Sequence, residues 1–224
     1  MTLGARTVIP ILGLALVATA FAADIVVEDW SSQPVGTKGV PPPWQKQRWG
    51  NPAYDLTIVE DAGRKVLHLK SAADSSNISK DIKGKVNLKQ TPILEWSWRV
   101  VELPKGANAA KKSTDDEAAQ IYVTWPHFPQ AFRSRIIGYI WDATSPVGSF
   151  VPSQKTGMVH YVVVRTGTAE LGKWFTERRN VVDDYVKVYG EQPENPGVIS
   201  VAIDSDDTLS SAESFFGAIL FRKP

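Results

Sequence analysis

The sequence predicts an all-β fold, an antiparallel β-sandwich with one short helix. From Ile25 onward, short runs of β-branched and aromatic residues are separated by clusters of glycine, proline, asparagine, aspartate and serine, which is the pattern of a sandwich or barrel. The run from Ile93 to Val101 has the two-residue period of a strand with one buried face, and a single later segment carries both caps of a helix. No internal repeat is visible, so we expect one domain over residues 23–224.

Residues 1–22 are predicted to be a cleaved signal peptide. Arg6 is the only charged residue before Asp24, and an apolar run over residues 8–18 ends in the small-residue pattern Ala20-Phe21-Ala22. The run is shorter than the roughly 20 residues that span a bilayer. We therefore expect a periplasmic or secreted protein with no integral membrane segment after cleavage; the alternative is a retained anchor helix.

The composition narrows the classes of function. The 224-residue chain has 25 lysines and arginines against 24 aspartates and glutamates, so it has no electrostatic footprint for nucleic acid. It has no cysteine, which excludes disulfides, a thiol nucleophile and a thiolate metal site. His68, His127 and His160 lie in separate elements without the spacing of a zinc site, and no nucleophile elbow or phosphate-binding loop is present.

Turn signals divide the mature chain into predicted strands. These span residues 25–30, 54–60, 65–70, 78–82, 86–88, 93–101, 118–125, 135–142, 158–166, 198–205 and 215–221. Asp61-Ala62-Gly63 joins the second and third strands as a hairpin. Around Ile137 and Val163 nearly every residue is apolar, which predicts central strands covered on both faces. The lysine-rich segment 104–116 is predicted to be an exposed, mobile loop.

Side-chain alternation predicts which faces of these strands are buried. In residues 93–101, one face is predicted to pack in the core and carries Leu94, Trp96, Trp98 and Val100. In residues 118–125, Gln120, Tyr122 and Thr124 lie opposite the apolar set and are predicted to face outward.

One helix is predicted after residue 180. Asn180 is a suitable N-cap with Asp183 three residues later, and Gly190 ends the segment. Its apolar side consists of Val181, Val182, Tyr185, Val186 and Tyr189.

The acidic run Asp204-Ser205-Asp206-Asp207-Thr208 has two interpretations. Oxygen ligands from Asp204, Asp206 and Asp207 suit calcium, but an EF-hand would require glycine where Leu209 stands. The other interpretation, which we favour, is a turn whose side chains bond its own backbone. We accordingly expect no cofactor, with calcium as the alternative.

Aromatic and polar residues suggest a second kind of site. Sugars stack their C–H faces on indole and phenol rings, and their hydroxyls bond planar polar groups. Tyr122 and Trp141 are the candidate rings. Glu177, between aromatics and two arginines, is either a sugar-hydroxyl acceptor or one half of a structural ion pair.

An ordered set of segments resembles the DUF3047 family, a domain of unknown function in exported bacterial proteins. The similar segments lie at residues 94–100, 115–116, 118–123, 139–141, 162–165, 174–181, 184–185 and 203–208. The resemblance extends from about Asp29 to Phe221. It implies a concanavalin A-like jelly-roll β-sandwich, an architecture shared with lectins, glucanases and carbohydrate-binding modules, and it implies no activity. Asp207 departs from the asparagine frequent at that position in the family.

The expected function is binding of a saccharide or another polar cell-envelope ligand on the concave sheet. The candidate ligand-binding residues are Gln120, Tyr122, Trp141, Glu177, Arg178, Asp204 and Asp206. One rival is a polysaccharide lyase that uses Tyr122 or His160 as base, with Gln120 and Arg178 neutralising the uronate. Another is a glycoside hydrolase that pairs Glu177 with Asp204 or Asp206. A non-catalytic envelope assembly protein is the third. We favour a protein without enzymatic activity over these catalytic alternatives.

Overall fold

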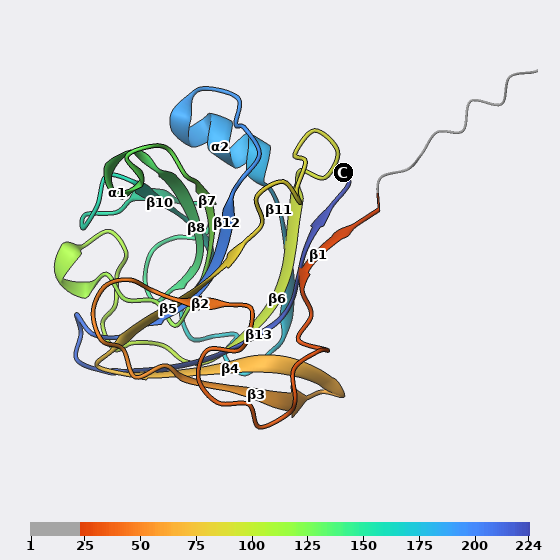
Figure 1. Ribbon diagram of the computed structural model, residues 1–224. Helices are drawn as coiled ribbons and strands as arrows, with labels where there is room; N and C mark the ends of the chain where they lie inside the picture. Colours follow the sequence, from red (N-terminus) through yellow and green to blue (C-terminus); the bar gives the residue numbers. More distant parts are fainter. Residues whose placement is uncertain (1–22) are drawn as a thin grey trace, which may run out of the picture.

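Two β-sheets pack face to face in the computed structural model, which describes residues 23–224 (Figure 1). The predicted signal peptide, residues 1–22, lies outside the described residues. The six-stranded sheet has the order β11 (Phe175–Asn180), β6 (Ile93–Glu102), β13 (Ser211–Arg222), β4 (Arg64–Ala72) and β3 (Asp55–Asp61), with β1 (Ile25–Glu28) paired to β13. The seven-stranded sheet has the order β2 (Gln45–Lys46), β5 (Ser75–Asp81), β12 (Val198–Asp204), β7 (Ala119–Trp125), β8 (Arg135–Asp142), β10 (Val159–Thr166) and β9 (Phe150–Pro152).

This arrangement is the predicted all-β jelly-roll sandwich. The hairpin at Asp61 and the strands 93–101, 118–125, 135–142 and 158–166 are confirmed to within a residue. Residues 86–88 form no strand, and the prediction there was wrong; β2, β9 and β11 were not predicted. One pairing is not antiparallel, because β10 runs parallel to β8.

Large aromatic side chains fill the space between the sheets. Trp96 and Trp98 of β6 are fully buried, as their alternation predicts. Their rings meet two side chains of β8 from the opposite sheet: Trp96 lies 5.3 Å from Tyr139, and Trp98 lies 6.1 Å from Trp141, centroid to centroid. The core therefore joins the two sheets through aromatic pairs.

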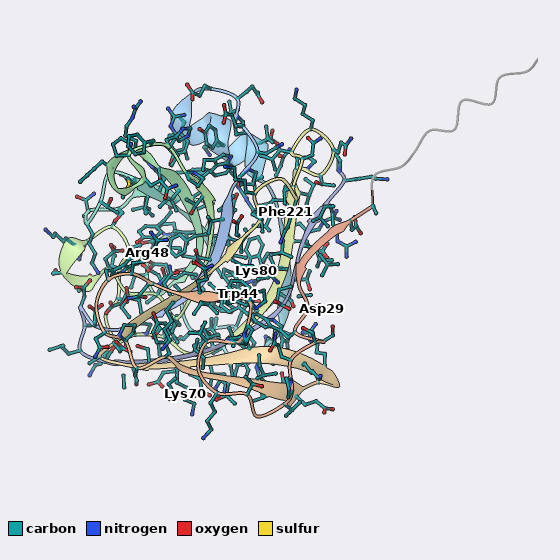
Figure 2. The ribbon with its side chains drawn as sticks, viewed as in Figure 1. Asp29, Trp44, Arg48, Lys70, Lys80 and Phe221 are labelled. Atoms are coloured by element: carbon teal, nitrogen blue, oxygen red, sulfur yellow. The ribbon has the colours of Figure 1, made fainter. Side chains whose placement is uncertain are left out.

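A buried carboxylate closes one side of this core. Glu28 is 5 % exposed and accepts hydrogen bonds from Trp44 Nε1 at 2.9 Å and from Lys80 Nζ at 2.8 Å. Figure 2 shows Trp44 and Lys80 beside each other, and the Lys80 ammonium lies 5.7 Å from the Trp44 ring. The buried negative charge of Glu28 is thus paired with the positive charge of Lys80.

The helix α2 (Val181–Tyr189) is confirmed together with both caps. The Asn180 side chain accepts hydrogen bonds from the first turn, and Gly190 adopts the left-handed conformation with φ 75°. Arg179 forms an ion pair with Asp184, which also accepts a hydrogen bond from Tyr139 at 2.9 Å. These contacts fasten α2 across one end of the sandwich (Figure 1). Within residues 23–224, no helix is long and apolar enough to cross a bilayer.

The lysine-rich segment 104–116 is not simply an exposed loop, so that prediction was wrong in part. It contains the short helix η1 (Lys112–Thr114), yet Ala107 and Ala109 are fully buried. Ala109 packs against Ile140 and its backbone N–H donates to Asp142 Oδ2 at 2.8 Å. The segment therefore covers part of the seven-stranded sheet on the side away from the core. A second short helix, α1 (Gln130–Arg133), connects β7 to β8.

Candidate functional site

The outer face of the seven-stranded sheet is the face turned away from the six-stranded sheet. Strand register places its residues in two neighbouring rows, since the residues between them along each strand belong to the core. The first row is Ser79, Ser200, Tyr122, Gly138 and Tyr161. The second row is Asn77, Ala202, Gln120, Ile140 and Val163. Gln120 and Tyr122 therefore face outward, as their alternation predicts.

Tyr122 is held in place by its neighbours on this face. Its ring lies over the backbone of Gly138 and 6.4 Å from the ring of Tyr161. Its hydroxyl donates a hydrogen bond to Gln120 Oε1, and Gln120 Nε2 donates to the backbone carbonyl of Glu117 at 3.2 Å. Gln120 thus connects the tyrosine to the segment that precedes β7.

Two backbone segments meet at one end of the outer face. Asp204 N–H donates to the Glu117 carbonyl at 3.0 Å. The Asp116 carboxylate accepts from the N–H groups of Asp207 at 3.1 Å and Thr208 at 2.7 Å. The turn after β12 is therefore fixed to the segment before β7, although the two are far apart in sequence.

These segments bring together a group that we call the carboxylate cluster, consisting of Asp115, Asp116, Glu117, Asp204 and Asp206. Asp116, Asp204 and Asp206 each offer an oxygen, and these oxygens all lie within 4.8 Å of one another. Glu117 is 1 % exposed, and neither of its carboxylate oxygens has a hydrogen-bond partner in the described chain. The three aspartates could hold a cation.

Burial and mutual repulsion set the charges of the cluster. Burial, reinforced by the hydrogen bond and charge of Asp206, raises the pKa of Asp204 to about 9. The same hydrogen bond lowers the pKa of Asp206 below its ordinary value. Burial also raises the pKa of Glu117 well above its usual range, and the charges of Asp115 and Asp204 add to the effect. Without a cation, protons therefore stay on part of the cluster at neutral pH.

Asp207 lies beside the cluster but does not join it. Its carboxylate forms an ion pair with Lys155, whose Nζ also donates to the Asp115 carbonyl at 3.2 Å. Of the predicted calcium ligands Asp204, Asp206 and Asp207, the last is thus replaced by Asp116, because the turn directs Asp207 toward Lys155.

Three predicted ligand-binding residues lie elsewhere. Trp141 is fully buried between the sheets, and its indole N–H donates to the Gly167 carbonyl at 3.1 Å. Glu177 on β11 accepts from Trp98 Nε1 at 3.1 Å and pairs with Arg165, so it belongs to the structural ion pair foreseen as its alternative role. Arg178 is exposed and lies 3.4 Å from Glu95. The predicted set is corrected accordingly: Gln120, Tyr122, Asp204 and Asp206 converge, and Trp141, Glu177 and Arg178 do not join them.

Sequence reasoning missed several members of the site. Asp115-Asp116-Glu117 directly before a predicted strand was a usable signal, since three consecutive acids at a strand entry are costly to place together. Tyr161 and Lys155 gave no such signal, because only the β8–β10 pairing and the loop between β9 and β10 bring them here.

The sequence profile of a family described as "Protein of unknown function (DUF3047)" matches residues 42–220. No protein with a curated description matches the chain.

Several solved structures are similar to the sandwich. The K2 cleaved adhesin domain of Lys-gingipain has 10 % sequence identity and a TM-score of 0.44, over 89 % of this chain and 99 % of that one. The family 30 carbohydrate-binding module of a cellulosomal cellulase from Clostridium thermocellum has 12 % identity and a TM-score of 0.44, over 90 % and 98 % of the two chains. The xyloglucanase domain of NopAA from Sinorhizobium fredii has 13 % identity and a TM-score of 0.42, over 80 % and 93 %.

Proposed function

The chain belongs to the DUF3047 family, whose function is unassigned, and on that premise we propose that it binds a saccharide or a similar polar ligand on the outer face of the seven-stranded sheet. Export to the periplasm or secretion from the cell is part of the same proposal. It rests on the signal-like pattern of residues 1–22.

A strip of free polar side chains carries the proposal. Asn77, Ser79, Ser200 and Thr124 lie across β5, β12 and β7, and their side chains make no hydrogen bond to any other residue of the described chain. Asn77, Ser79 and Thr124 are half-buried, so they are partly accessible. Such a strip offers donors and acceptors at the spacing of neighbouring strands, and a chain of ring hydroxyls can bond to it.

Two aromatic side chains border the strip. Tyr122 lies within the first row, and Trp49, which is 63 % exposed, follows β2 at the sheet edge. Gln47 ties this part of the chain to β5, because it accepts from Asn77 N–H and donates to the Trp49 carbonyl at 3.0 Å. Arg48, in the same loop, is labelled in Figure 2 on the side of the molecule where η1 lies in Figure 1. An exposed indole in a loop that is bonded to β5 at Asn77 is suited to stacking on a sugar ring.

The catalytic alternatives have less support. Burial, together with the charges of Glu117 and Asp204, holds the pKa of Tyr122 well above its ordinary value, so the phenol is a hydrogen-bond donor and a poor base. The glycoside hydrolase alternative pairs Glu177 with Asp204 or Asp206. Glu177 instead bonds Trp98 and Arg165 and does not join these aspartates.

Isothermal titration calorimetry tests the proposal. The probes are cellohexaose, xylohexaose, mannohexaose and an alginate hexamer, titrated into residues 23–224. We expect at least one to bind, and a combined Asn77→Ala and Ser79→Ala variant to bind it about thirtyfold more weakly, because each of the two lost hydrogen bonds is worth about 1 kcal/mol. Thr176→Ala, an exposed polar position on β11, is the matched control and should bind as the wild type does.

A second pair of variants tests the aromatic border. Trp49→Ala should weaken the same interaction, whereas Phe132→Ala should not, although Phe132 is an exposed aromatic residue of similar size. Equal binding by wild type and by all strip variants would show that the ligand lies elsewhere.

A further inference from the structure

The oxygens of the carboxylate cluster converge from three parts of the chain. Asp116 precedes β7, Asp204 ends β12, and Asp206 lies in the following turn. One oxygen from each of these residues lies within 4.8 Å of the corresponding oxygens of the other two, which is the spacing of oxygens that share an ion. Acidic side chains alone do not make a metal site, so the argument needs a second observation.

Glu117 provides that observation. Its side chain is 1 % exposed, and both of its carboxylate oxygens lack a partner among the described residues. The charges that act on it come from Asp115, Asp116, Asp142 and Asp204, so it faces other carboxylates. Buried polar groups are almost always satisfied, and a buried carboxylate usually has a cationic partner or a metal.

The ammonium group of Lys155, which lies near the cluster, already has other partners. Lys155 pairs with Asp207 and donates to the Asp115 carbonyl. The two oxygens of Asp142 accept from the backbone of Thr144, Ser145 and Ala109, so this carboxylate is fixed by N–H groups. Glu117 has no comparable donors. Within the described chain, no cationic side chain bonds the Glu117 carboxylate.

We propose that Asp116, Asp204 and Asp206 bind one divalent cation beside the unpaired carboxylate of Glu117, and that this cation is calcium. All three ligands are hard oxygens, which favours calcium or magnesium over zinc or copper. The ligands come from a turn and an irregular segment, and calcium accepts such irregular geometry more readily than the octahedral magnesium ion does.

The surroundings hold the ligands before the ion binds. The N–H groups of Asp207 and Thr208 orient the Asp116 carboxylate, and the Asp204 N–H donates to the Glu117 carbonyl. The same carbonyl accepts from Gln120, which bonds the Tyr122 hydroxyl. Bound calcium would thus hold the turn after β12 against the segment before β7, and it would stabilise the positions of Gln120 and Tyr122 on the outer face. The cation site stands independently of any saccharide.

Thermal unfolding and equilibrium dialysis test the site on residues 23–224 after treatment with EDTA and removal of the chelator. With 1 mM CaCl2, we expect about one calcium ion per chain and a rise in Tm of about 5 °C or more, as for a ligand at some hundred times its Kd. Magnesium at the same concentration should give a smaller shift.

Two variants test the site. Asp206→Asn changes a ligand and Glu117→Gln removes the unpaired charge beside the ion, so each should lower calcium affinity about tenfold or more. Asp206 is exposed and can be changed with little risk to folding. Asp183→Asn, an exposed aspartate in the first turn of α2, is the matched control and should keep wild-type affinity. Circular dichroism and the Tm in EDTA verify that each variant is folded.

The saccharide titration separates this proposal from the preceding one. Calcium binding with the expected variant effects supports the site even when no sugar binds. Three results would overturn it: no calcium-dependent shift in Tm, less than about 0.1 calcium bound per chain, or equal calcium affinity in the wild type and both variants. Protonation alone would then stabilise the carboxylate cluster.

Discussion

Tyr122 occupies the space that a side chain at position 138 would need. A Cβ built on Gly138 would lie 2.6 Å from Tyr122 Cε1 and 3.1 Å from Tyr161 Cδ1. Real Cβ atoms do not approach other atoms at the shorter distance. The position of Tyr122 on the outer face therefore depends on a missing side chain in the neighbouring strand.

Gly138→Ala should destabilise the protein and displace Tyr122. We expect a loss of about 1–3 kcal/mol in the free energy of unfolding, the usual cost of overpacking, measured by urea denaturation. Binding of any saccharide that the wild type recognises should weaken as well. Gly157→Ala is the control, because a Cβ there meets no atom within 4 Å. Equal stability of the two variants would mean that Tyr122 is free to move.

Glu28→Gln should be strongly destabilising. The substitution removes the carboxylate that pairs with Lys80 and accepts from Trp44, and it leaves the Lys80 ammonium half-buried without its counter-charge. Breaking a buried pair costs about 3–5 kcal/mol, and urea denaturation at pH 7 measures it. Glu60→Gln, at an exposed position of β3, should change stability by less than about 0.5 kcal/mol. A similar small effect for Glu28→Gln would contradict the role of the pair.

The same carboxylate predicts a pH dependence. Burial pushes the pKa of Glu28 up, but hydrogen bonds from Lys80, Trp44 and the Trp30 backbone outweigh it and hold the pKa below the ordinary 4.5. The folded protein therefore binds this proton less readily than the unfolded chain does, and the stabilisation is present above pH 4.5 and lost as the pH falls through the folded-state pKa. The stability gap between wild type and Glu28→Gln should narrow between pH 5 and pH 3. A gap that is constant with pH would mean that the charge of Glu28 contributes nothing.

Trp141→Phe separates the core from the outer face. It removes the indole that bonds the Gly167 carbonyl and packs against Trp98, so we expect a loss of about 1–3 kcal/mol in unfolding free energy. Saccharide and calcium affinities of the folded variant should remain those of the wild type, as calorimetry at 20 °C would show. A selective loss of saccharide affinity would instead place Trp141 in the binding site.

Local patterns predicted the elements that depend on local physics. The alternation in β6 and the two caps of α2 could be seen in the sequence, because each is set by residues a few positions apart. The burial of Ala107 and Ala109 could not be seen, since two alanines among lysines carry no periodic signal. The parallel direction of β10 was equally hidden, because an apolar run has the same pattern in either direction.

The candidate site was predictable only in part for a related reason. Gln120, Tyr122, Asp204 and Asp206 lie on strands or turns whose faces follow from alternation. Asp116 reaches the site through hydrogen bonds to a turn some ninety residues later, a contact that no local pattern encodes. Glu177 and Arg178 have the residue types of a binding site, but Glu177 pairs with Arg165 of the opposite sheet and Arg178 with Glu95 of the neighbouring strand, and the sequence reveals neither contact.

The strand order also determines when this protein can fold. β12 lies between β5 and β7 in one sheet, and β13 lies between β4 and β6 in the other. Until the chain beyond Val198 has been synthesised, the strands β1, β4, β5, β6 and β7 each lack a partner strand, and unpaired strand edges recruit other chains. Neither sheet can be completed before β12 and β13 have been synthesised. A ribosome-stalled or C-terminally truncated chain would be prone to aggregate. Removing β13 alone would separate the strand pair β11–β6 from the pair β4–β3, because β13 lies between them.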